Sequence, residues 1–222
     1  MNVTPLNRLG SGGRARGGLN DLSAVVLDAR WQGLLDGAAA ACGGPAVFRM
    51  RKLVEARDLL ALGQLSGRLD VGMLDLADDL RALFTLRVPV ARRPTPDGQL
   101  LLADRALLAL TYPREALSRP MPGPALVVML APVDPWYATV ALGPVRPVCL
   151  AAGNLPAGVR VRDLVLATYG ALSGQNVQVD EFDPGGVLNV EAARWWQQNR
   201  NRLPLTREPF VAPPVTAAKE KS

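Results

Sequence analysis

The clearest hydrophobic pattern in the chain lies between Pro124 and Leu172. Residues 125–130 form a continuous apolar run, and a second run follows at 138–142, so the pattern predicts two neighbouring buried strands. Residues 145–151 are expected to form a third strand at the sheet edge, because Pro147 cannot donate a ladder hydrogen bond. Residues 159–172 then have apolar positions at helical spacing, which predicts a helix that covers the strands.

Upstream of this stretch the pattern favours helices. Asn20 is the predicted N-cap of a helix that continues to the alanine run before Cys42. A short strand is expected at 46–50 and a second helix at 52–65. A third helix is expected over 70–84, on which apolar residues recur at positions 73, 74, 77, 80 and 84. The region 19–86 is therefore expected to be helical.

Residues 87–98 have the sequence RVPVARRPTPDG, with three prolines and three arginines. This composition predicts a linker or loop between the helical region and a mixed core at 99–206. In that core, residues 100–110 are strongly apolar, with strand an option at 100–103 and helix at 104–110, and the period does not separate the two. Asn189 is expected to cap a last helix.

The two ends of the chain differ from the rest in composition. A basic Gly/Arg arm at 1–18 and a Pro-rich tail at 207–222 are predicted to be flexible. The pattern as a whole predicts an α+β fold. Its helical N-terminal half packs against a small β-sheet and covering helices in the C-terminal half, with a flexible arm at each end.

Part of the predicted core resembles a known family. The segments SRPMPGPALVVMLAPVDPW and GVRVRDLVLATYGAL are similar to a domain of unknown function common in mushroom-forming fungi. Both have a Pro-flanked strand, a Pro-Trp pair and a Gly-Val-x-Val-x-Asp-x-Leu helix ending near a Tyr. This chain departs from that pattern by extra prolines before the helix and by lacking an Arg-rich final helix segment of the same length. The resemblance covers residues 118–172 and implies a fold without implying an activity. The matching residues are Pro124, Pro135, Trp136, Gly158, Val159, Val161, Asp163, Leu164 and Tyr169.

The charge of the chain points towards acidic partners. The 222 residues carry a net charge of +5 and have a pI near 9.8, and arginine supplies almost all of the positive charge. Arginine binds phosphate in a bidentate manner, so RNA is one candidate partner, although GC-rich coding produces the same composition. Two clusters are the predicted contacts to nucleic acid or a neighbouring subunit. They are Arg8, Arg14 and Arg16 in the arm, and Arg87, Arg92 and Arg93 in the loop.

Three tryptophans are candidate interface residues. Trp136 lies between prolines and the Trp195–Trp196 pair lies on the last predicted helix among arginines. Packing in the core or at a protein interface is favoured over stacking on bases, because large aromatic side chains mainly supply buried area.

The residue types that catalysis usually needs are scarce. The chain has no histidine, so a histidine base, a Ser-His-Asp triad and a Cys/His zinc site are excluded. Cys42 and Cys149 are expected to be small buried hydrophobic residues. Asp75, Asp78 and Asp79 are expected on the solvated face of the third helix rather than at a metal. We therefore expect no enzymatic activity, no cofactor, no metal and no small-molecule substrate.

These observations favour a structural subunit of a larger assembly, of the capsid or nucleocapsid type, whose arms contact neighbouring copies and RNA. The alternative is a monomeric or dimeric protein-interaction module without nucleic-acid binding. The sequence shows neither a secretory signal nor an apolar run long enough for a membrane span. A cytoplasmic or virion location without membrane contact is therefore expected.

Overall fold

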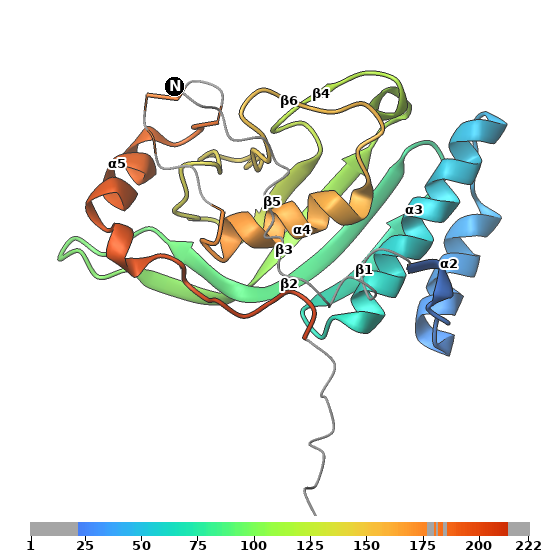
Figure 1. Ribbon diagram of the computed structural model, residues 1–222, viewed down its shortest axis with the longest axis horizontal. Helices are drawn as coiled ribbons and strands as arrows, with labels where there is room; N and C mark the ends of the chain where they lie inside the picture. The colour runs from blue at the N-terminus through green and yellow to red at the C-terminus, as the bar shows by residue number, and fades with distance from the viewer. Residues whose placement is uncertain (1–21, 177–179, 181, 184–185, 213–222) are drawn as a thin grey trace, which may run out of the picture.

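The computed structural model describes residues 22–176, 180, 182–183 and 186–212. In this part of the chain a four-stranded antiparallel sheet in the order β1-β2-β3-β5 packs against helices, with a small two-stranded sheet beside it (Figure 1). The α+β prediction is confirmed. The helices are η1 (Leu22–Ala24), α2 (Ala29–Ala40), α3 (Ala46–Leu65), η2 (Arg114–Leu117), α4 (Val161–Leu172), α5 (Val190–Gln198) and η3 (Arg200–Arg202). The strands are β1 (Leu69–Asp75), β2 (Leu80–Arg92), β3 (Leu101–Tyr112), β4 (Met121–Pro122), β5 (Val127–Ala131) and β6 (Asn154–Leu155).

Alternate residues of the long strands point into one core. On β2, Phe84 and Leu86 are buried while Arg81 and Arg87 are exposed. Phe84 lies opposite Leu108 of β3, and the same alternation continues along that strand. A two-residue period with one buried face is what an antiparallel sheet covered on one side requires.

The helices α3 and α4 cover the buried face of the sheet. Figure 1 shows α4 lying across the strands and α3 beside it, with α2 packed along the outer side of α3. Trp31 of α2 is buried against Gly63 of α3, and a Cβ added at Gly63 would lie 3.3 Å from the indole ring. This glycine therefore lets the two helices approach closely.

The predicted helix over 70–84 is wrong, and residues in this range form β1 and β2. The apolar residues of β2 alternate, whereas β1 changes phase at a register shift between Val71 and Met73. A bulge of this kind moves side chains from one face to the other, so the summed pattern of the two strands imitates a helical period. Asp75 ends β1, and Asp78 and Asp79 lie in the turn rather than on a helix.

The predicted linker at 87–98 is also wrong in part, because β2 continues to Arg92. Pro89 lies at a register shift between β2 and β3. The regular pairing is already interrupted there, so the N–H that proline lacks is not needed for a ladder hydrogen bond. Residues 104–110 belong to β3 instead of a helix. The chain between Arg92 and Leu101 is thus the connection of a long hairpin.

Other local predictions have mixed outcomes. Residues 46–50 are the first turns of α3, not a strand, and 138–142 and 145–151 form isolated bridges, not strands. The strand at 125–130 and the helix at 159–172 are confirmed as β5 and α4. Asn189 caps α5 as predicted, since its Oδ1 accepts from the Ala192 N–H at 3.1 Å. Asn20 lies outside the described residues, and Asp28 caps α2.

Part of the predicted flexible tail packs against the body of the protein. Residues 203–211, named here the C-terminal strap, follow η3 and run below α4 towards the end of α3 (Figure 1). The Leu205 N–H donates to the Ser173 carbonyl at 2.8 Å, and Phe210 is buried. Residues 1–18 and 213–222 lie outside the described residues.

Candidate binding surfaces

Two arginines of the predicted RNA-contacting loop are paired with acids. Arg92 donates from Nε and Nη2 to both oxygens of Asp134, at 2.8 and 2.9 Å. This bidentate contact lowers the pKa of Asp134 and raises that of Arg92. Arg93 donates to Glu191 at 2.8 Å and lies 5.2 Å from the centre of the Trp136 ring. Both guanidinium groups therefore have anionic partners within the chain.

The third arginine of that cluster borders a shallow hollow on the sheet. Arg87 is exposed at the end of the regular β2–β3 pairing, and its Nη1 lies 3.4 Å from the Gly67 carbonyl oxygen. The hollow has a volume of 430 Å³. Its lining residues are Arg68, Arg87, Val88, Pro89, Leu102, Ala103 and Asp104. Arg8, Arg14 and Arg16 lie outside the described residues, so RNA contact by either cluster stays a prediction.

Two of the three predicted interface tryptophans are core residues. Trp196 is fully buried and donates from Nε1 to the Trp136 carbonyl at 2.7 Å, and Trp136 is 6% exposed. The prediction that these two rings form a surface is wrong, because other parts of the same chain cover them. Trp195 is half-buried, contacts Trp196 edge to face and lies 5.4 Å from the Arg202 guanidinium.

A buried lysine holds the turn that carries the predicted acidic cluster. Lys52 of α3 is fully buried, and its Nζ donates to the backbone carbonyls of Leu76, Ala77 and Asp78. Within the described residues, no group of three or more acids or cysteines is arranged to hold a metal ion.

A buried glutamate links α3 to α4. Glu55 is fully buried; its Oε2 accepts from the Val161 N–H at 2.7 Å, and its Oε1 lies 2.8 Å from Arg51 Nε. Arg51 also donates to the Gly158 carbonyl at 2.8 Å. Because α4 has no side-chain cap of its own, Glu55 supplies the acceptor that its first turn lacks. Burial raises the pKa of Glu55, against the lowering effects of the Val161 N–H and Arg51.

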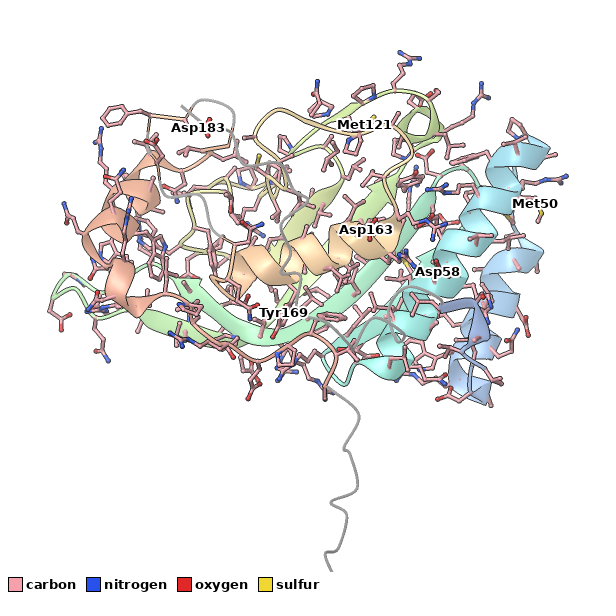
Figure 2. All side chains as sticks on the ribbon, viewed as in Figure 1. Met50, Asp58, Met121, Asp163, Tyr169 and Asp183 are labelled. Carbon is pink, nitrogen blue, oxygen red and sulfur yellow. The ribbon has the colours of Figure 1, made fainter. Side chains whose placement is uncertain are left out.

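The N-terminal half of α3 presents an exposed apolar row. Val47, Met50 and Val54 are 76%, 63% and 43% exposed and follow the i, i+3, i+7 spacing of one helix face. Figure 2 shows Met50 at the edge of the molecule, pointing away from the sheet. We name these three residues the α3 row. Sequence reasoning missed the row because it assigned a strand to its first half.

Of the two cysteines, Cys149 lies in an environment that disfavours its thiolate. Cys149 is buried and donates from Sγ to the Ala151 carbonyl at 3.1 Å. Burial raises the pKa of the Cys149 thiol, which lowers the thiolate fraction at neutral pH. Cys42 is half-buried, and neither cysteine forms a disulfide with another described residue. The prediction of a buried hydrophobic residue is confirmed for Cys149.

Comparisons with known proteins found no family model, no curated protein and no solved structure that matches this chain. The resemblance to a fungal domain therefore stays a prediction. No helix among the described residues combines the length and the apolar character needed to cross a membrane.

Proposed function

We propose that this chain is a non-enzymatic protein-interaction module, and that the α3 row binds an acidic amphipathic helix of a partner protein. The observation that carries the proposal is the exposure of Val47, Met50 and Val54 on one face of a 20-residue helix. Apolar anchors at this spacing suit the apolar face of a second helix.

The charge around the α3 row selects an acidic partner. Residues 46–54 contain no acid, and Arg49 is an exposed cation beside the row, whereas Arg51 and Lys52 are engaged within the fold. The N-cap of α3 is Pro45, which makes no side-chain capping hydrogen bond, so the positive end of the helix dipole lacks a carboxylate at its first turn. Glutamates flanking the apolar face of a partner helix would complement both features.

The buried contacts behind α3 favour this role because they hold the helix in one place. Lys52 fastens α3 to the β1–β2 turn and Glu55 fastens it to α4. A surface on a helix that is fixed in the free protein loses little conformational entropy on binding.

The test is a fluorescence-anisotropy titration of the whole chain with two synthetic amphipathic helices. One helix carries leucines on one face with flanking glutamates, and the other has the same leucines with flanking lysines. We expect the acidic helix to bind and the basic helix to bind at least about tenfold more weakly. Added salt should reduce this difference in affinity. Equal binding of the two helices would refute the proposed specificity.

A pair of variants locates the site. Met50→Glu places a like charge in the centre of the α3 row, and we expect it to weaken binding of the acidic helix by at least about tenfold. Val133→Glu is the matched control, because Val133 is 70% exposed on a separate loop, and its affinity should stay within about twofold of wild type. Equal effects of the two substitutions would rule out the α3 row.

The assembly subunit with RNA-contacting arms remains the second candidate. The net charge of +5 supports it. The pairing of Arg92 with Asp134 and of Arg93 with Glu191 lowers the free positive charge that the loop offers to phosphate. Size-exclusion chromatography with light scattering and the 260/280 nm absorbance ratio separates the two. Large RNA-containing particles would favour the assembly subunit, and a monomer or dimer free of RNA would favour the interaction module.

A further inference from the structure

The C-terminal strap is bound by side chains of the folded body in the way that a receptor binds a peptide. Arg68 pairs with the Glu208 carboxylate, and its Nε donates to the Pro209 carbonyl at 3.2 Å. The Tyr169 hydroxyl donates to the Glu208 carbonyl at 2.7 Å. Two side chains from different elements therefore recognise one acidic residue and the backbone beside it.

The next residue of the strap fills an apolar position. Phe210 is 7% exposed and packs edge to face on Tyr169, with ring centres 5.1 Å apart. Ser66, the C-cap residue of α3, donates from Oγ to the Phe210 carbonyl. Figure 2 shows Tyr169 on the side of α4 that faces the strap. We name Ser66, Arg68 and Tyr169 the socket.

The strap is extended and, between Leu203 and Val211, forms neither helix nor strand. In the described residues it also follows every helix and strand of the fold, so no later element depends on its position. Its contacts with the socket run from socket side chains to strap backbone and to the Glu208 and Phe210 side chains. Such contacts select an acidic residue and, two positions later, an aromatic residue, with Pro209 between them in this chain. They are independent of the chain that supplies the segment.

We propose that the socket is a peptide-binding site for extended acid–proline–aromatic segments of a partner protein, and that Glu208-Pro209-Phe210 is its tethered occupant. An incoming segment competes with the strap for Arg68 and Tyr169. The tether keeps the strap at an effective concentration of about 1 mM, so the free chain binds such segments weakly until the strap is displaced. The socket lies at the C-terminal end of α3 and involves no residue of the α3 row, so this proposal and the proposed function can fail separately.

The test uses the full chain and a fluorescein-labelled peptide with the sequence of residues 205–212, LTREPFVA. Phe210→Ala removes the aromatic anchor of the strap in cis, and we expect the peptide to bind this variant about tenfold more tightly than wild type. The same peptide with alanine in place of its phenylalanine is the control and should not bind. Equal affinity of wild type and Phe210→Ala would overturn the proposal, as would no binding to either at about 1 mM peptide.

A second variant tests the proposal if circular dichroism shows that Phe210→Ala does not fold. Glu208→Arg keeps Phe210 in the chain and replaces the Arg68 ion pair by repulsion, so the strap should release and the peptide should again bind more tightly than to wild type. Charge reversal then tests specificity. Arg68→Glu alone leaves Glu208 in the strap, so like-charge repulsion should keep the strap displaced. This variant should not bind LTREPFVA and should bind LTRRPFVA, and loss of both peptides would overturn the assignment of Arg68.

Binding of the acidic amphipathic helix is measured on the same variants. We expect it to be unchanged by Phe210→Ala and Glu208→Arg, because neither residue contacts the α3 row. If a variant lost binding of both the acidic helix and the LTREPFVA peptide, the cause would be unfolding and not displacement of the strap. That result would contradict the role of the strap in the socket.

Discussion

Replacing Lys52 by methionine tests whether one buried cation holds the β1–β2 turn. Lys52 is fully buried in α3, and its Nζ donates to three backbone carbonyls, with distances of 2.8 Å to Asp78 and 3.3 Å to Ala77. The Nζ also lies 5.0 Å from the centre of the Phe48 ring. Methionine keeps the unbranched side chain and removes the charged Nζ, and with it all three hydrogen bonds.

The expected loss of stability depends on which of the three carbonyl groups water can reach once the lysine is replaced. Leu76 is fully buried, whereas Ala77 and Asp78 are exposed. An acceptor left buried and unpaired costs about 1–3 kcal/mol, and a hydrogen bond to a charged donor contributes about 1.5–3 kcal/mol. Relief of the desolvated charge offsets part of this sum. We therefore expect Lys52→Met to lower the free energy of unfolding by about 3 kcal/mol, which corresponds to a fall in Tm of about 6–12 °C for a chain of this size.

The assay is urea unfolding followed by circular dichroism, with Arg49→Met as the matched control. Arg49 is exposed on the same helix, so the same loss of a cation there should change stability by no more than about 0.5 kcal/mol. A loss of less than about 1 kcal/mol for Lys52→Met, or equal losses for both variants, would refute the argument that the buried donors fix the turn.

Two further predictions concern groups whose titration is shifted by burial. Because the pKa of Glu55 is raised from 4.5, the folded state retains a proton that the unfolded state releases, so stability should fall as pH rises above 4.5 until that raised pKa is passed. Urea unfolding over a pH series should show a shallower fall for Glu55→Gln, and identical slopes would contradict the assignment. In Cys42→Ser, the remaining Cys149 thiol should react with a disulfide reagent only as fast as the protein opens, because it is buried and its pKa is raised. Rapid reaction of the native variant would contradict this and make Cys149 a candidate nucleophile.

The helices with local signals could be predicted from the sequence. The apolar spacing of α4 and the Asn189 cap of α5 are properties of neighbouring residues, and both predictions are confirmed. The long hairpin could not be predicted in the same way. Register shifts near Val71 and Pro89 interrupt the two-residue period, and a proline that marks a loop in most sequences lies here at a bulge.

The buried polar groups depend on contacts far apart in the chain. Glu55 accepts from an N–H 106 positions away, and Lys52 donates to carbonyls 24 to 26 positions away. The local sequence around a charged helix residue does not reveal a hydrogen-bond partner that is distant in the chain. Charged side chains usually lie on the protein surface, so burial is not expected for them. The same reasoning explains the arginine loop, where Arg92 meets Asp134 only after the sheet has formed.

The two proposed binding surfaces share α3, and this determines how they relate to one another. The α3 row occupies the first half of the helix, and Ser66 of the socket is its C-cap residue, so Ser66 lies about 18–28 Å along the helix axis from the residues of the row. Lys52 and Glu55 fasten this helix to the β1–β2 turn and to α4. Coupling between two sites requires an element with two arrangements that both ligands favour differently. Because buried hydrogen bonds hold α3 to the β1–β2 turn and to α4, we expect it to keep one arrangement when either ligand binds. We therefore expect the two proposed ligands, the acidic helix and the acid–proline–aromatic segment, to bind independently. One partner protein could then engage both surfaces only if its two segments were joined by a linker that spans the distance between them.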